Sequence, residues 1–219
     1  GVCTHLACAD SLREDDIKYT KNQIEKFNFA VNEIKGEGIN PGILHCSNSG
    51  AIFLHPDAHF DMVRPGIVIY GYSSCAKELG IKLKPVMEFS SQIVAIKHFN
   101  KGETVSYDRT WTATEDCDIG VIPAGYADGL VRRLSPGLEV AINGKMFPIV
   151  GRICMDQCMV LLGKNHEVNR WDKVVFFGPE ENCKTAEDLA NQIDTISYEI
   201  LCGVNKRVPR IYIDTGKNK

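Results

Sequence analysis

The sequence predicts an α/β fold followed by a β-rich domain, and three observations carry that prediction. Strand-like and helix-like segments alternate through residues 1–72. A polar, lysine-rich stretch at 73–86 has the composition of a linker. From residue 87 to 219, short apolar runs recur between turn residues, as they do in β domains. Because βαβα order with near-continuous apolar strands indicates a parallel sheet covered by helices, we expect residues 1–72 to form the last part of a TIM-type α/β barrel.

The first part is expected to hold short buried strands beside one long helix. Strand-like runs occupy 2–6 and 43–46, and further apolar runs follow at 62–64 and 67–70. The helix begins after Ser11 and ends near Gly36 and Gly38. Its apolar residues fall on one face at steps of three, four and seven: Ile17, Ile24, Phe27, Val31 and Ile34. A polar turn at 47–50 then opens a short helix that runs through Phe53.

The second part is expected to be a β domain with two short helices near its end. The predicted strands are 89–96, 104–111, 119–123, 138–142, 146–154, 158–162 and 173–177. Asn143-Gly144 predicts a hairpin turn. Thr185 should open a helix that has Glu187 and Asp188 in its first turn. A second helix is expected at 197–201, and a closing strand at 210–213.

Composition excludes several classes of function. The formal net charge of −3 lacks the basic excess of nucleic-acid-binding proteins. No apolar run approaches the roughly 20 residues that cross a bilayer, and we expect no signal peptide. The nine cysteines include no Cys-x-x-Cys pair, so we expect reduced, mostly buried thiols in a cytoplasmic domain without a metal site. Since Gly1 leads at once into a strand-like run, we also expect a longer parent chain.

Four places could carry chemistry, and each has an ordinary structural alternative. Tyr107, within KGETVSYDRTW, could move a proton or pack on a strand surface. The 47–50 turn could bind phosphate at a helix N-terminus or cap that helix, and capping is the more common outcome. Arg64 could face an active-site mouth or lie on the surface. The loop 124–133 could line the path of an anionic substrate or form a solvated turn.

Seven strings in order along the chain resemble the alanine racemase family, which includes serine-racemising relatives. They are THLACADS, HCSNSGA, DMVRPGIVIYG, VSYDRTW, PAGYADGLVRRL, GRICMDQCM and KRVPRIY. The resemblance implies a racemase that uses pyridoxal 5′-phosphate (PLP) and interconverts L- and D-alanine, L- and D-serine, or both, for peptidoglycan precursors. It also implies a homodimer of chains that each join a PLP-binding barrel to a C-terminal β domain, with active sites shared between subunits.

Specific roles follow from the same resemblance. Tyr107 is implied as one of two catalytic acid/bases, and since a phenol has an ordinary pKa of about 10, its neighbours must tune it. The cofactor-binding residues implied are His5 against the pyridine ring, Arg64 at its nitrogen, and Asn48, Ser49, Gly66 and Ile67 around the phosphate. The implied substrate-binding residues are Tyr126, Arg132, Met155 and Asp156. In the dimer, Tyr107 and Met155 would act in the partner's barrel.

The sequence departs from the family pattern in two ways. The lysine that binds PLP lies upstream in the family, and no lysine of this chain lies in a matching motif. Several alanine racemases also carry a tyrosine just before RVPRIY, where this chain has Gly203-Val204-Asn205-Lys206. Asparagine replaces a tyrosine in this region of the serine-racemising branch linked to vancomycin resistance, so Asn205 fits serine as a substrate. Ordinary alanine racemases also vary here, so alanine stays open as the alternative. A parent of that branch would be membrane-anchored.

Two other readings stay open beside the racemase. The chain without its lysine could be a non-catalytic folding and dimerisation module. A PLP-dependent decarboxylase with a similar barrel fits less well, since VSYDRTW and MDQCM belong to the racemase pattern.

Overall fold

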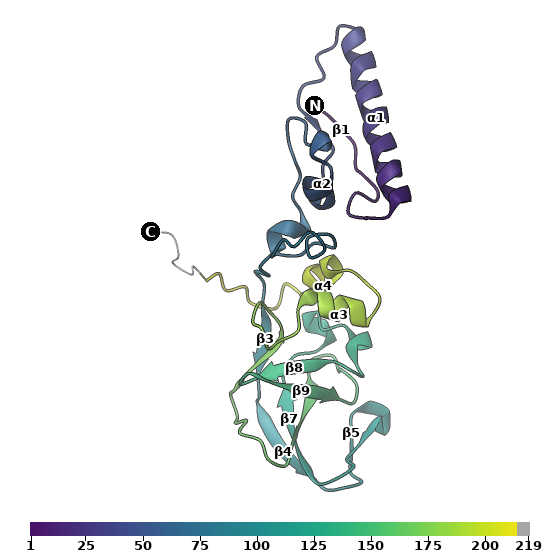
Figure 1. Cartoon of the computed structure of the whole chain (residues 1–219). Helices are drawn as coiled ribbons and strands as arrows, with labels where there is room; N and C mark the ends of the chain where they lie inside the picture. The colour runs from purple at the N-terminus through teal and green to yellow at the C-terminus, as the bar shows by residue number, and fades with distance from the viewer. Residues whose placement is uncertain (214–219) are drawn as a thin grey trace. The chain divides into compact units, whose positions relative to one another are not determined.

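The structure, a computed structural model, describes residues 1–213 (Figure 1). The chain divides into two compact units between Val86 and Met87. The division falls at the end of the segment expected as a linker.

The first unit places a long helix against a small parallel strand pair. β1 (Val2–Cys3) pairs in parallel with β2 (Leu44–His45), with Val2 opposite Leu44 and Cys3 opposite His45. The long α1 (Glu14–Gly36) lies between them in the sequence, and the short α2 (Ser49–Leu54) follows β2. This is the predicted βαβα order. Two short 3₁₀ turns, η1 (Pro56–Ala58) and η2 (Ile67–Tyr70), complete the unit.

The amphipathic pattern of α1 is confirmed by its burial. Ile24, Phe27 and Val31 are buried, while Ile17 and Ile34 are half-buried at the ends of the same face. The Ser11 hydroxyl donates to Asp16 in the first turn at 2.6 Å, and acidic residues occupy that turn. Negative charge there suits the positive end of the helix dipole. Ile24 joins a core cluster with Leu6, Ala9, Cys46, Ala51 and Ala58.

The apolar runs at 62–64 and 67–70 are not strands, which corrects the sequence reading. Ile67–Tyr70 forms the 3₁₀ turn η2, and only Ile67 of its residues is buried. The backbone N–H groups of Gly66 and Val68 donate to the Ser49 hydroxyl at 2.9 and 3.5 Å. In this structure these N–H groups point to Ser49 and not to a neighbouring strand, and Pro65 has no N–H to offer.

The second unit is built on a seven-stranded sheet whose paired neighbours are all antiparallel. Its order is β3-β11-β8-β9-β10-β7-β4. The strands are β3 (Phe89–Gln92), β4 (Ala95–Phe99), β7 (Cys117–Ile122), β8 (Glu139–Ile142), β9 (Lys145–Val150), β10 (Cys158–Gly163) and β11 (Lys173–Phe177). Burial alternates along β10, which matches one face in the core and one outside.

The predicted strand 89–96 is split, and the split shows that the sheet curls. β3 and β4 are the two edge strands, yet only Ile93 and Val94 separate them in the sequence. The N–H of Ile93 donates to Asp172 beside β11, and the N–H of Val94 donates to Val121 in β7. Because two consecutive residues reach both edges of the sheet, those edges must lie close together.

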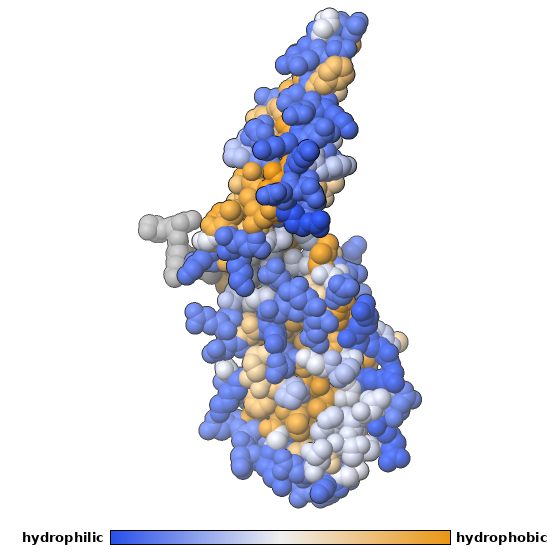
Figure 2. All heavy atoms as spheres, turned by 45° about the vertical axis from the view of Figure 1, so that its right-hand side comes forward, coloured by the Kyte–Doolittle hydropathy of each residue, from blue (hydrophilic) through white to orange (hydrophobic). Residues whose placement is uncertain are grey.

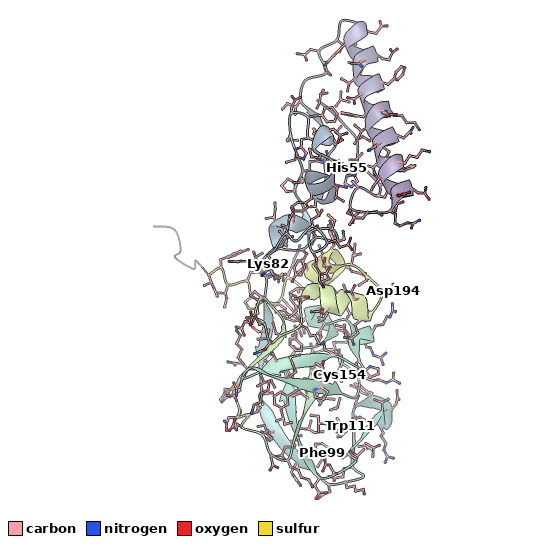
Figure 3. All side chains as sticks on the ribbon, in the orientation of Figure 1. His55, Lys82, Phe99, Trp111, Cys154 and Asp194 are labelled. Atoms are coloured by element: carbon pink, nitrogen blue, oxygen red, sulfur yellow. The ribbon has the colours of Figure 1, made fainter. Side chains whose placement is uncertain are left out.

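The predicted strand 104–111 is instead a small hairpin around a 3₁₀ turn. β5 (Thr104–Val105) pairs with β6 (Trp111–Thr112), and η3 (Tyr107–Arg109) connects them. Val105 packs in a core cluster with Ala113, Cys117, Ile119 and Val150, and Phe99 and Trp111 cover it (Figure 3). A continuous strand would require extended backbone at 107–109, where Asp108 and Arg109 have positive φ.

The predicted hairpin and helices at the end of the chain are confirmed, but the closing strand is wrong. Asn143 and Gly144 both have positive φ between β8 and β9, as a two-residue type I′ turn requires. Thr185 caps α3 (Ala186–Gln192) in a reciprocal capping box with Asp188, and α4 (Ser197–Gly203) follows. Residues 210–213 form no strand, and Ile211, Tyr212 and Ile213 are more than four-fifths exposed.

Apolar residues also reach the surface of both units (Figure 2). Within residues 1–213, no helix has the length and apolar character needed to span a bilayer. All nine cysteines are free, and four of them (Cys46, Cys75, Cys117 and Cys158) are buried.

Candidate functional site

Arg64 lies at the centre of a fixed cluster in the first unit. Its guanidinium contacts His45 Nδ1 at 2.7 Å, the carbonyl oxygen of Thr4 at 2.9 Å and that of Cys46 at 3.2 Å. His5 Nδ1 lies 3.4 Å from the same group. These partners come from the ends of β1 and β2, so the strand pair itself orients the arginine. Arg64 is half-buried and well partnered, which disfavours the reading of a loose surface residue.

The contact with Arg64 also determines which ring nitrogen of His45 carries the proton. A guanidinium can only donate, so His45 Nδ1 accepts and its ring proton lies on Nε2. His45 was not singled out from the sequence; the signal was present, because it precedes Cys46 in the string HCSNSGA. Burial raises the pKa of the Cys46 thiol, and the positive charge of Arg64 opposes that rise.

A second feature of the first unit is a pair of backbone N–H groups that point to the hydroxyl oxygen of Ser49. The Ser49 side chain is buried and accepts from the N–H groups of Gly66 and Val68. The segment 64–68 therefore runs beside 47–49, and the N–H of Arg64 also donates to the Ser47 carbonyl at 2.9 Å. Backbone N–H groups that converge on one oxygen are the kind of donor that phosphate sites use.

Asn48 holds the structure of this turn. Its side-chain oxygen accepts from the Ala51 N–H at 3.1 Å, which caps α2, and its amide donates to the Leu6 carbonyl at 3.1 Å. Of the two alternatives for the 47–50 turn, helix capping and phosphate binding, Asn48 therefore fits helix capping. The hydroxyl and N–H groups at Ser49, Gly66 and Ile67 remain the phosphate candidates.

In the second unit, Tyr107 stands on a constrained turn with its side chain 70% exposed. Ser106, before it, has φ 80° and ψ 168°, a region that non-glycine residues rarely adopt. The Ser106 hydroxyl accepts from the Arg152 N–H at 2.7 Å, and the Arg152 side chain reaches Asp108 at 3.1 Å. The segment after β9 thus holds the turn from both sides of Tyr107. Its exposure disfavours the alternative that Tyr107 packs on a strand surface.

Tyr126 and Met155 lie on two loops that contact closely. Tyr126 opens the 3₁₀ turn η4 (Tyr126–Asp128), and its N–H donates to the Cys154 carbonyl at 3.0 Å. The N–H of Ala127 donates to the Met155 carbonyl at 3.0 Å. At Gly125 a Cβ would lie 2.3 Å from the Cys154 oxygen, so only glycine permits this approach. Tyr126 and Met155 are 43% and 54% exposed.

Arg207, which sequence reasoning did not single out, bridges two aspartates of these loops. Its Nε donates to Asp128 at 2.7 Å and its Nη2 donates to Asp156 at 2.6 Å. These bonds, Asp128 first, raise the pKa of Arg207. The only signal in the sequence was its place in the string KRVPRIY.

The remaining predicted residues lie near these loops in different ways. Arg132 begins the 3₁₀ turn η5 (Arg132–Leu134) and is exposed. Asn205 is taken up by backbone bonds: its N–H donates to the Asp128 carbonyl at 3.0 Å, and its side-chain oxygen accepts from the Arg207 N–H at 3.1 Å. This turn gives Asn205 a structural role, which weakens the argument that its side chain selects serine.

Both units match known family models in order along the chain. Residues 1–74 match the model described as alanine racemase, N-terminal domain, and residues 86–212 match alanine racemase, C-terminal domain. The chain belongs to the alanine racemase family. Among relatives of this family, an alanine racemase from Treponema denticola is 54% identical over 219 residues, which is 98% of this chain and 58% of that protein. One from Treponema pallidum is 46% identical over 97% of this chain and 58% of its own length.

Solved structures of the family show the same fold. The alanine racemase of Clostridium difficile 630 in complex with cycloserine has a TM-score of 0.90 at 37% identity, covering 99% of this chain and 57% of that one. The Bacillus anthracis alanine racemase with bound L-Ala-P has a TM-score of 0.89 at 35% identity, covering 99% and 56%. This chain therefore spans less than two thirds of the length of the family members it matches.

The donor set of the first unit fits the cofactor that the family implies. The phosphate of PLP calls for N–H or hydroxyl donors, and its pyridine nitrogen calls for one side chain held in place beside it. The Ser49 turn offers the former and Arg64, fixed by its contacts to His45, Thr4 and Cys46, offers the latter.

Proposed function

We propose that the protein carrying this chain is a PLP-dependent alanine racemase, working as a homodimer. The observation that carries the proposal is the match of both units, in order, to the two domains of one racemase family. The chain would supply part of the cofactor site in its first unit and one acid/base, Tyr107, in its second. Tyr107 and Met155 would serve the partner's active site.

The residues of the first unit would hold the cofactor. Ser49 and the N–H groups of Gly66 and Ile67 would bind its phosphate, His5 would pack on its ring, and Arg64 would donate to the ring nitrogen. When bound, PLP supplies the electron sink that makes the α-proton of an amino acid removable. An arginine keeps its own proton at all relevant pH values, so Arg64 would leave the ring nitrogen unprotonated and limit side reactions.

Tyr107 would move the proton on one face of the substrate. Racemisation needs one group that removes the α-proton and another that returns a proton to the opposite face. The side-chain oxygen of Tyr107 would take that proton as a phenolate, or return a proton as a phenol, depending on the direction of the reaction. The constrained turn Ser106–Arg109 and its bonds to Arg152 would hold the oxygen at a fixed place. The opposite group would be the lysine that the family carries upstream.

The proposal is tested with the complete parent protein and PLP. L-to-D and D-to-L conversion of alanine and of serine is followed by chiral chromatography. We expect Tyr107→Phe to lose about 10²- to 10⁴-fold in turnover from at least one enantiomer while cofactor absorbance persists. Tyr19→Phe, which changes an exposed tyrosine of α1, is the matched control and should leave turnover unchanged.

Other results would redirect the assignment. Equal turnover of Tyr107→Phe and wild type in both directions would remove Tyr107 from the mechanism. Serine is included because residues 203–206 contain no tyrosine before the final RVPRIY string. Comparable rates on both amino acids would place the protein in the serine-racemising branch. No conversion by the parent protein would support the alternative, a non-catalytic folding and dimerisation module.

A further inference from the structure

Arg207 joins three separate segments of the second unit. It follows α4 in a turn, and its guanidinium reaches Asp128 at 2.7 Å on one loop and Asp156 at 2.6 Å on another. The aspartates are 79 and 51 residues away along the chain. Two carboxylates on adjacent nitrogens of one guanidinium use the planar fork that lysine lacks.

Asp128 is the inner anchor of this network. Its side chain is 14% exposed. Its second carboxylate oxygen accepts from the Gly125 N–H at 2.8 Å, which closes the turn that presents Tyr126. Its carbonyl accepts from the Asn205 N–H at 3.0 Å. A carboxylate so little exposed to solvent needs a partner, and Arg207 provides the positive charge.

The two loops that Arg207 bridges are already coupled through their backbones. Tyr126 and Ala127 donate to the carbonyls of Cys154 and Met155. Arg207 adds a side-chain link through Asp128 and Asp156, which follow Tyr126 and Met155 in the same loops. Tyr126, Met155 and Asp156 therefore keep one arrangement. The network holds exposed side chains rather than a core.

Asp156 is the outer end of the network, with a side chain 58% exposed. Its charge lies next to Met155, which is also exposed. Under the proposed function the substrate is an amino acid, and an unpaired aspartate beside its path would repel the substrate carboxylate, attract its ammonium group and so disturb its orientation. The bond to Arg207 offsets that negative charge.

We propose that Arg207 is a positioning residue that holds the loops of Tyr126 and Met155 together and offsets the charge of Asp156 along the substrate path. The inference rests on the proposed function and adds a residue to it. Loss of Arg207 should therefore raise KM more than it lowers kcat, because Arg207 would act on the approach and binding of the substrate and not on the proton transfer.

The test measures kcat and KM for alanine in the complete protein with PLP. Because exposed ion pairs are modest, we expect Arg207→Ala to raise KM about three- to fivefold and to change kcat less than about twofold. Arg207→Lys keeps the positive charge but lacks the planar guanidinium, so its KM should fall between the values of wild type and Arg207→Ala. The double variant Arg207→Ala with Asp156→Asn should bring KM back toward the wild-type value, since it removes the Asp156 charge that Arg207→Ala leaves unpaired.

The control is Arg170→Ala, because Arg170 packs over the Trp171 ring at 4.4 Å and should leave KM unchanged. An unchanged KM in Arg207→Ala would overturn the inference, and no recovery in the double variant would overturn its second part, the offset of the Asp156 charge. A wild-type protein that converts no amino acid would instead show that the proposed function is wrong.

Discussion

At the scale of single residues, His55 occupies a place that favours the neutral imidazole. The side chain is 4% exposed and lies between α2 and α1 (Figure 3). Among the described atoms, its Nε2 is buried without a hydrogen-bond partner. Burial lowers the pKa of His55 below its ordinary value, Lys21 adds to that effect and Asp57 opposes it. The charged form is therefore disfavoured in the folded state.

This lowered pKa makes stability depend on pH in a defined direction. Below about pH 6.5 the unfolded chain binds a proton at His55 that the folded chain does not, so the free energy of unfolding falls as the pH drops. We expect His55→Leu to flatten this dependence between about pH 6.5 and 5, measured by urea unfolding at several pH values. The other five histidines remain in both proteins, so the difference between the two profiles reports His55. Parallel profiles would contradict the assignment.

At the scale of elements, the turn η3 combines backbone strain with a compensating hydrogen bond. Ser106 holds φ 80° and ψ 168°, which costs a non-glycine residue about 1–3 kcal/mol. Its hydroxyl accepts from the Arg152 N–H, a bond that contributes about 1 kcal/mol. A serine in this conformation keeps both the shape of the turn and its link to the Arg152 segment.

Two substitutions at Ser106 separate these contributions. Ser106→Ala loses the hydrogen bond and keeps the strain, so it should lower the free energy of unfolding by about 1 kcal/mol. Ser106→Gly loses the same bond but relieves the strain, so it should be more stable than the alanine variant. Chemical denaturation of both variants beside wild type makes the comparison. A glycine variant that is the less stable of the two would show that the turn is not strained.

Across the two units, the sequence predicts the regular elements well and the irregular ones poorly. β11 and the Asn143-Gly144 hairpin follow local pattern and turn chemistry, so short windows sufficed. The run 67–70 looks equally apolar, but its flanking N–H groups bond to Ser49, which lies 17 residues away from Gly66. Arg207 could not be found in this way, because its two aspartates become neighbours only when the β domain folds.

The two units differ in how much regular sheet they contain, and this difference predicts which of them folds alone. Residues 87–213 contain a seven-stranded curled sheet with its own buried residues, which is enough to fold alone. The sheet of the first unit has two strands of two residues each, and isolated strand pairs are marginal in water. We therefore expect residues 87–213, expressed alone, to show a β-type circular dichroism spectrum and one cooperative thermal transition. Residues 1–86 alone should show no cooperative transition, and a sharp transition there would contradict the argument.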